Sequence, residues 1–344
     1  TLTYSGYAKR ATVDTFREQG RGGKGVIGAD LKEEDFVSDL FVASTHDYIM
    51  FFTNKGLVYW LKVYMVPEMS RTSKGRALVN LLDLEEDEIV TGMVPVREFD
   101  VDDAYVCMAT QKGKIKRTEL NVFGKRGSGG IIAIKLAKDD KLIGVRRTDG
   151  SKNLSLATRN GYAIRFPEDD VRPQGRVAGG VRGIKLRKGD RVVDLAVQEP
   201  ETTLLTVCEN GYGKRTEFEE YSLQHRGGMG VQNIKTTKRN GKVVAARAVN
   251  EEEQLILITE AGMTVRTSVD AISCIGRGTQ GVKIVTTNKE DVVSGVAVVP
   301  PQEEEEGPEE LVEPEEELTE EEEKRQQLEE YIDALAAEDE EEEE

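Results

Sequence analysis

The stretch LLTVCENGYGKRTE, residues 204–217, places an apolar run and a second strand-like run on either side of the dipeptide Asn210-Gly211. Asn-Gly accommodates the positive φ values that a tight hairpin turn demands. The stretch therefore predicts two antiparallel strands, and its turn glycine recurs along the chain at intervals of 48 to 57 residues. Six repeats are expected, with turn glycines at Gly6, Gly56, Gly113, Gly161, Gly211 and Gly262.

A second pattern, R-x-x-x-G, occurs once in each repeat, in register with the turn glycines. Because every repeat carries it, we expect its arginine to form bonds within the fold and its glycine to occupy a turn or bulge. A further short strand follows, so about four strands fit each unit and six units form a propeller-like, all-β disc. The six pairs are Arg21 and Gly25, Arg71 and Gly75, Arg126 and Gly130, Arg176 and Gly180, Arg226 and Gly230, and Arg277 and Gly281.

The composition narrows the class of protein. Of 344 residues, 38% are hydrophobic and 34 are glycine, which fits many strands and turns. No apolar run approaches the roughly 18 residues of a membrane-spanning helix, so no membrane contact is expected. The chain begins at Thr1, and we expect it to be cut from a longer polypeptide. Three cysteines without a C-x-x-C pair favour a reducing cytoplasm.

The net charge of −17 is distributed unevenly. Residues 302–344 hold 24 acidic and two basic residues, whereas residues 1–301 hold 45 basic and 40 acidic residues, a net charge of +5. We expect a globular part over residues 1–301 and a largely disordered acidic tail over 302–344. Within the tail, Thr319 and Glu322 form a capping box that predicts a short helix at about 319–337. The tail either only aids solubility or competes with an anionic partner for the basic part.

Basic side chains recur four residues after the turn glycine, where only the second repeat departs, with Trp60. Equivalent positions in a radial fold lie at equivalent places, so these side chains are expected to mark one exposed edge as a positive ring that contacts phosphates. The alternative is that they are ordinary exposed charges that aid solubility. The candidate DNA-binding residues are Arg10, Arg117, Arg165, Arg215 and Arg266, with Lys9, Lys116 and Lys214 one residue earlier.

The first repeat contains a glycine-rich loop, QGRGGKG, at residues 19–25. Successive backbone N–H groups of such a loop, together with Arg21 and Lys24, suit a phosphate oxygen. The loop is not a P-loop, because it lacks the G-x-x-x-x-G-K-S/T pattern between a strand and a helix. The sequence also contains no recognition helix or zinc finger, so binding to the DNA backbone with weak sequence preference is expected.

The loop resembles the gyrase A box, usually written QRRGGKG, which stands in the first of six repeats in the gyrase A C-terminal domains of the type IIA topoisomerases. GYAKR at residues 6–10 and STHDYIMFFTNKGLVYWLKVY at residues 44–64 also resemble this family, over essentially residues 1–300. The resemblance implies a six-bladed β-pinwheel, with strands exchanged between blades, that wraps duplex DNA. Gly20 departs from the family arginine. The box residues that the resemblance assigns to DNA binding are Gln19, Arg21, Gly22, Gly23, Lys24 and Gly25.

The resemblance further implies that the domain presents DNA to the gate of DNA gyrase for negative supercoiling. It implies the rest of the gyrase A polypeptide and the gyrase B polypeptide as partners, with the catalytic tyrosine and ATP hydrolysis outside this chain. We expect no cofactor, no metal, a monomeric isolated domain, and a bacterial, nucleoid-associated location. The alternatives are a topoisomerase IV type domain and a protein-binding propeller scaffold. An enzyme with a central active site is disfavoured, because His46 and His225 lie near no catalytic or metal-ligating partner in the sequence.

Overall fold

The computed structural model describes residues 2–3, 6–11, 37–39, 43–70, 73–124, 129–261, 263–287 and 291–299, with the backbone alone at 37–39. All of them belong to one compact unit, Thr1–Arg17 with Gly25–Gln302. The loop at residues 19–25, Arg71, Arg126 and the tail with its predicted helix at 319–337 lie outside the described residues. The domain boundary at residue 301 therefore stays a prediction.

The stretch at residues 204–217 forms the predicted hairpin. Strand β16 (Thr203–Cys208) pairs antiparallel with β17 (Tyr212–Glu217), and Leu204 lies opposite Thr216. Gly211 closes the turn with φ of 75°, and a Cβ atom at this position would lie 2.3 Å from the carbonyl oxygen of Val285. Glycine is required here because an L side chain would be both strained and blocked.

Every repeat contains such a hairpin, and each hairpin defines one blade, numbered 1 to 6 along the chain. An inner strand pairs with the first strand of each hairpin. The hairpins are β1 (Leu2–Thr3) with β2 (Tyr7–Ala8), β4 (Tyr48–Thr53) with β5 (Leu57–Lys62), β8 (Tyr105–Thr110) with β9 (Lys114–Glu119), β12 (Asn153–Thr158) with β13 (Tyr162–Pro167), β16 with β17, and β20 (Gln254–Thr259) with β21 (Thr264–Ser268). The inner strands are β3 (Val37–Asp39), β7 (Val90–Val96), β11 (Leu142–Thr148), β15 (Val192–Gln198), β19 (Val243–Val249) and β23 (Val293–Val299).

The outer strand of each of blades 1 to 5 comes from the following repeat. For example, β14 (Val181–Arg182) completes the sheet β11-β8-β9-β14, although its residues belong to the fourth repeat. The strand exchange implied by the pinwheel resemblance is therefore confirmed. Among the described residues, the sixth blade has three strands, β21-β20-β23. The outer strands are β6 (Arg76–Ala77), β10 (Ile131–Ile132), β14 (Val181–Arg182), β18 (Val231–Gln232) and β22 (Val282–Lys283).

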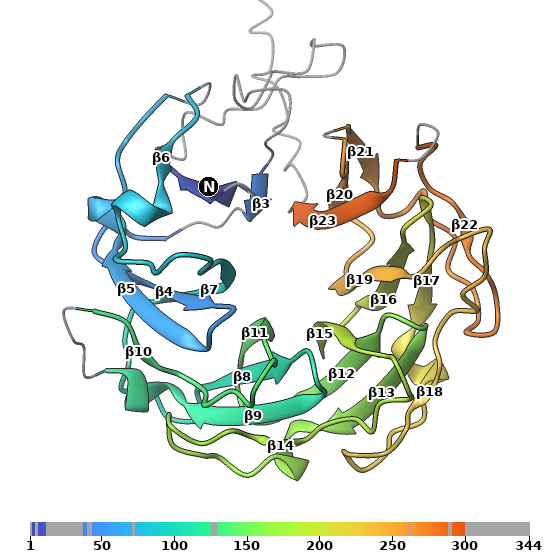
Figure 1. Ribbon diagram of the computed structural model, residues 1–344, viewed down its shortest axis with the longest axis horizontal. Helices are drawn as coiled ribbons and strands as arrows, with labels where there is room; N and C mark the ends of the chain where they lie inside the picture. The colour runs from blue at the N-terminus through green and yellow to red at the C-terminus, as the bar shows by residue number, and fades with distance from the viewer. Residues whose placement is uncertain are drawn as a thin grey trace, which may run out of the picture. The chain divides into compact units, whose positions relative to one another are not determined.

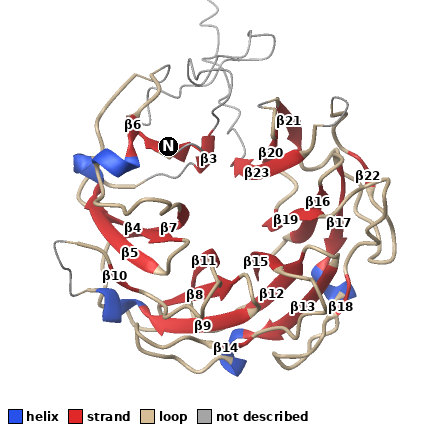
Figure 2. Cartoon of the chain, viewed as in Figure 1, coloured by secondary structure: helices blue, strands red, loops and turns tan. Residues whose placement is uncertain are grey.

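The blades follow one another around a common centre, with the inner strands facing it and the two-residue outer strands at the periphery (Figure 1). Neighbouring inner strands contact each other from β7 through to β23, and β23 contacts β3, so the last blade meets the first. Helical structure in the described part is limited to single turns (Figure 2). They are η2 (Val63–Met65), η3 (Leu78–Asn80), η4 (Leu120–Phe123), η5 (Glu168–Asp170) and η6 (Phe218–Glu220). None of these described helices is long and apolar enough to cross a membrane.

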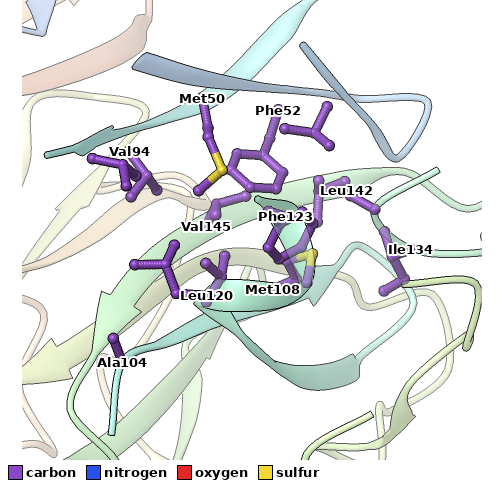
Figure 3. Packing of buried hydrophobic residues seen from close by; sticks show 14 residues of the cluster. Met50, Phe52, Val94, Ala104, Met108, Leu120, Phe123, Ile134, Leu142 and Val145 are labelled. Atoms are coloured by element: carbon purple, nitrogen blue, oxygen red, sulfur yellow. The ribbon is translucent and has the colours of Figure 1, made fainter. Parts of the chain in front are cut away.

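The hydrophobic core lies between blades rather than within one layer. Figure 3 shows Met50 and Phe52 of blade 2 packed against Met108 and Val145 of blade 3. The rings of Phe52 and Phe123 meet edge to face, with centroids 5.9 Å apart. The sheet of blade 2 is covered on its other face by blade 1, where Phe51 and Tyr59 pack with Leu2 and Ala8. Coverage on both faces explains why five of the six residues in β4 are buried.

Candidate nucleic-acid interface

The hairpin turns lie at one end of the sheets, here called the turn end. The amide that begins an inner strand donates to the hairpin turn of the preceding blade, as from Leu142 N to Asn54 O at 3.1 Å and from Val192 N to Gln111 O at 2.9 Å. These bonds place successive turns on the same side of the ring. The segments that run from an outer strand to the next inner strand lie at this end too, and they reach from the periphery towards the centre.

The lysines that the sequence assigned to DNA are buried. Lys116 and Lys214 are 0% exposed, and Lys9 is 4% exposed. Lys116 Nζ donates to the carbonyl oxygens of Ala133 at 2.5 Å and Arg176 at 2.6 Å. In the corresponding places, Lys214 Nζ donates to Gly276 O at 2.7 Å, and Lys9 Nζ donates to Ser73 O at 2.8 Å. Each ammonium group therefore bonds the following repeat.

Four of the five assigned arginines also reach the following repeat. Arg215 Nε donates to Ile272 O at 2.7 Å, and Arg165 donates to Phe218 O at 2.7 Å. The remaining two form bonds of the same kind: Arg10 Nε donates to Val66 O at 2.8 Å, and Arg117 pairs with Asp169 at 3.2 Å. Arg266 differs, because it is exposed and its Nε donates to Gln254 within its own hairpin.

The prediction of an exposed ring is therefore wrong for Lys9, Lys116, Arg117, Lys214 and Arg215, which are at most 6% exposed. The physical reason is that the second hairpin strands β9 and β17 are covered by neighbouring chain on both faces, so adjacent residues such as Lys116 and Arg117 are both buried. The acceptors recur with the same period as the donors. Arg10 and Arg165 are partly exposed but hold the same kind of interblade bond.

The structural role predicted for the R-x-x-x-G arginines is confirmed at Arg226 and Arg277, but not at Arg176, whose side chain forms no hydrogen bond or ion pair with the described residues. Arg226 Nε donates to Asp170 O at 2.8 Å, and its Nη1 donates to Arg182 O at 3.1 Å. Arg277 donates to Gln232 O at 3.1 Å. Both arginines therefore join one repeat to the outer strand of another blade.

A different recurring basic set is exposed, and sequence reasoning missed it. These residues stand one or two, five and eight positions after the R-x-x-x-G glycine, at the periphery and the turn end. The sequence signal for this set is a lysine that recurs at intervals of 50 residues. Positions counted from the turn glycine did not reveal it. We call the set the rim lysines and arginines, and all its members are at least partly exposed. They are Arg76, Arg182 and Lys283 on the outer strands, Lys135, Lys185 and Lys235 five positions after the glycine, and Lys138, Lys188 and Lys238 eight positions after it.

An open pocket of about 710 Å³ lies beside this set on blade 3. Five basic residues and no acidic residue line it: Lys112, Lys114, Arg182, Lys185 and Arg226. Concentrated positive charge of this kind attracts anionic groups such as phosphates.

Two further arginines at the periphery are held in place over tyrosine rings. The guanidinium carbon of Arg187 lies 3.4 Å from the ring centroid of Tyr162, and that of Arg239 lies 4.9 Å from the ring centroid of Tyr212. Arg187 also donates to Met229 O at 2.7 Å. A cation fixed in this way loses less conformational entropy when it binds an anion.

Comparison with known proteins agrees with the repeat structure. The family model described as DNA gyrase C-terminal domain, beta-propeller, matches residues 1–44, 47–97, 104–149, 152–199, 202–250 and 253–300, one segment for each blade. The chain belongs to the DNA gyrase C-terminal domain family.

Curated relatives of this gyrase domain include the DNA gyrase A polypeptide of Haloquadratum walsbyi, 47% identical over 300 residues that cover 86% of this chain and 35% of the relative. The DNA gyrase A polypeptide of Staphylococcus aureus strain MRSA252 is 45% identical over 299 residues, with 86% and 34% covered. The chain thus spans about a third of the length of the curated relatives it matches.

Two solved structures resemble the gyrase domain closely. The structure of a DNA gyrase A C-terminal domain aligns with a TM-score of 0.70 at 30% identity, covering 87% of this chain and 98% of the other. The crystal structure of the C-terminal domain of DNA topoisomerase IV aligns with a TM-score of 0.76 at 25% identity, covering 88% and 93%.

The gyrase box pattern recurs within the described residues. Residues 224–230, QHRGGMG, match residues 19–25 at five of seven positions. In this copy Gln224 N donates to Arg165 O at 3.0 Å, and Gly227 N donates to Gly183 O at 2.6 Å. The copy therefore joins blade 4 to the end of the outer strand of blade 3, and it places Arg226 in the wall of the basic pocket.

Proposed function

We propose that this domain binds duplex DNA through its phosphate backbone and wraps it along the periphery. The observation that carries the proposal is the exposed basic set at equivalent positions of successive blades, with Lys135, Lys185 and Lys235 as its most regular members. Equally spaced cations on a curved surface match a bent polyanion, and backbone contacts carry no direct sequence information. Bending preferences of the DNA would supply whatever sequence preference exists.

The contacts predicted from the sequence take two roles in this proposal. Arg266 and the loop at residues 19–25 stay proposed DNA contacts. The lysines and arginines that bond the following repeat, such as Lys116 and Arg215, act on DNA indirectly, because they fix the spacing between blades and hence between the exposed cations.

In the intact enzyme, the wrapped segment would be presented to the DNA gate for negative supercoiling. The rest of the gyrase A polypeptide would supply the catalytic tyrosine, and the gyrase B polypeptide would hydrolyse ATP, so this domain would need no cofactor of its own. We propose that it works in the bacterial cytoplasm at the nucleoid and that the isolated domain is a monomer.

Wrapping is tested by ligating nicked plasmid in the presence of the purified domain and resolving the topoisomers. A shift in linking number that grows with protein concentration is expected, and its sign gives the handedness. An unchanged distribution would refute wrapping. The domain of topoisomerase IV, to which this fold is similar, is the second candidate class, and a weak or missing shift despite tight binding would favour it.

Phosphate binding has its own test. The logarithm of the association constant should fall linearly with the logarithm of the salt concentration, with a slope of about −0.9 for each phosphate neutralised. A protein-binding scaffold would show no such dependence for DNA. A slope near zero would therefore exclude a surface that follows phosphates.

The acidic tail is proposed to tune this binding. Its net charge of −22 opposes the +5 of residues 1–301, so it can compete with DNA for the same cations. A chain that ends at residue 301 should bind DNA more tightly at low salt than the full chain. Equal affinity and equal wrapping of the two would show that the tail only aids solubility.

A further inference from the structure

We propose that the duplex is anchored on one arc of the periphery, blades 3 and 4, rather than held equally by all blades. This inference rests on the proposed function, and its ligand is the phosphate backbone of duplex DNA. It concerns the rim segments, defined as the residues from each R-x-x-x-G glycine to the residue before the next inner strand.

The charge of the rim segments differs sharply from blade to blade. Residues 180–191 on blade 3 contain five basic residues and one acidic residue, Asp190, a net charge of +4, and residues 230–242 on blade 4 contain four basic residues and no acidic residue, also +4. Residues 130–141 on blade 2 carry +1. Residues 75–89 on blade 1 contain Arg76 and five acidic residues, a net charge of −4.

The one acidic residue of the rim segments on blades 3 and 4, Asp190, already accepts hydrogen bonds from backbone amides. Asp190 Oδ1 accepts from Asn160 N at 3.0 Å and from Arg191 N at 2.9 Å. Three basic side chains of the same segment, Arg182, Lys185 and Arg191, are exposed. The carboxylate therefore shapes the loop, while the cations remain accessible.

The two basic segments are joined into one surface. Lys185 N donates to Gly228 O at 2.8 Å, which seats residues 224–230 between the outer strands β14 and β18. Lys242 Nζ donates to Asn160 Oδ1 at 2.8 Å across the turn end. The basic pocket on blade 3 lies on this arc. Blades 3 and 4 are neighbours around the ring (Figure 1), and both carry basic rim segments, so the densest positive charge spans two adjoining blades.

Blade 1 presents the opposite charge at the equivalent place. Glu85, Glu86 and Asp87 lie at the surface there, and Lys55 pairs with Glu85 at 3.1 Å. At physiological salt, charge acts over about 8 Å, so the basic arc cannot offset this repulsion from two blades away. A duplex gains its strongest contacts on blades 3 and 4 and is held only weakly over blades 1 and 2.

The arc is tested with three matched double variants of the full chain, each replacing the lysines five and eight positions after the glycine. They are Lys185→Gln with Lys188→Gln on blade 3, Lys235→Gln with Lys238→Gln on blade 4, and Lys135→Gln with Lys138→Gln on blade 2. Affinity is measured over a salt series with duplexes of about 20 and about 150 bp. Equal thermal unfolding midpoints confirm that all variants fold, and the corresponding Lys→Arg variants should retain binding.

The blade 3 and blade 4 variants should each lose about tenfold or more in affinity for both duplexes, with a salt slope shallower by about 1 to 2. The blade 2 variant should lose less than about threefold under the same conditions. If the loss of affinity in the blade 2 variant lies within threefold of the losses in the other two variants, the proposal of an anchoring arc is overturned while the proposed function stays intact. Failure of the unaltered chain to bind duplex in a salt-dependent manner would instead overturn the proposed function itself.

Discussion

The ammonium nitrogen of Lys116 lies 2.6 Å from the carbonyl oxygen of Arg176, sixty residues further along the chain. The same nitrogen donates a second hydrogen bond inside the protein, to Ala133 O. The side chain that sequence comparison assigned to DNA thus joins blade 3 to the repeat that supplies its outer strand. This relationship makes the stability of the ring and its DNA affinity separable by mutation.

Replacing Lys116 by Met should lower the free energy of unfolding by about 1–3 kcal/mol at pH 8, because two buried carbonyl oxygens lose their donor. DNA affinity of the folded variant should change less than twofold, since the side chain is not exposed. Lys188→Met is the matched control. It should change stability by less than about 0.5 kcal/mol but weaken DNA binding. Urea unfolding and DNA titration of both variants measure these effects, and a DNA defect in folded Lys116→Met would return this lysine to the interface.

The buried lysines should make stability depend on pH. Burial lowers the pKa of Lys116 to about 7, with the charge of Arg176 adding to the shift, and lowers the pKa of Lys214 to about 8. The unfolded chain, with its ordinary lysine pKa near 10.4, binds more protons than the folded chain above these values. The free energy of unfolding should therefore rise as pH increases from about 7 to about 10.

Each lysine contributes up to about 1.4 kcal/mol per pH unit within that window. The rise is checked by urea unfolding at intervals of pH for the unaltered chain and for Lys116→Met with Lys214→Met. The double variant should lose most of the rise. Parallel pH profiles for the two proteins would show that these amines do not titrate as their burial implies.

Asp194 should be the carboxylate whose loss destabilises the ring most. It is buried on the inner strand β15, where it accepts from Leu195 N at 2.9 Å and pairs with Arg247 at 2.9 Å and Arg146 at 3.5 Å. Arg146 and Arg247 lie on the inner strands on either side. Asp194→Ala should cost about 3–5 kcal/mol, because two partly buried cations lose their partner.

Asp190→Ala, in the rim segment of the same repeat, serves as the control for Asp194, since its donors are backbone amides at the turn end. The thermal unfolding midpoint of Asp190→Ala should lie between those of the unaltered chain and Asp194→Ala. The same loss in both variants would argue against a special role for the pairing between inner strands.

Alanine substitution at three glycines distinguishes the cost of backbone strain from the cost of a steric clash. Gly230 has φ of 66°, and a Cβ atom there would lie 2.4 Å from Ala163 O, whereas Gly189 has φ of 71° with open space around it. Gly175 has neither feature. Alanine should cost more than about 3 kcal/mol at Gly230, about 1–2 kcal/mol at Gly189, and almost nothing at Gly175. Calorimetry of the three variants checks the order, and equal losses at Gly230 and Gly189 would show that close approach is unimportant.

The fold was largely predictable because its determinants are local and repeated. The turn at Asn210-Gly211 requires a positive φ whatever surrounds it, and six such turns at a nearly constant interval define six hairpins. The R-x-x-x-G arginines were also interpreted correctly at Arg226 and Arg277, because a residue needed by every repeat serves the repeat. The family resemblance followed from motifs that are contiguous in the sequence.

The candidate site was less predictable, because recurrence does not reveal exposure. Lys116 recurs at the equivalent position of two other repeats, as Lys9 and Lys214, and Lys185 recurs at intervals of 50 residues, so both could hold a phosphate by residue type alone. One is buried and the other exposed. The difference lies in what packs against them, which strand exchange brings from another repeat.

The sequence by itself determined the number of repeats, the hairpins and the family, since each depends on residues that are neighbours along the chain. Only the tertiary structure decided that the lysines and arginines after the turn glycine, except Arg266, bond the next repeat and that those after the R-x-x-x-G glycine are exposed. The reason is that burial depends on segments about fifty residues away, such as the loop that carries Arg176 over Lys116. A periodic sequence repeats donors and acceptors together, and their pairing appears only once the blades are assembled.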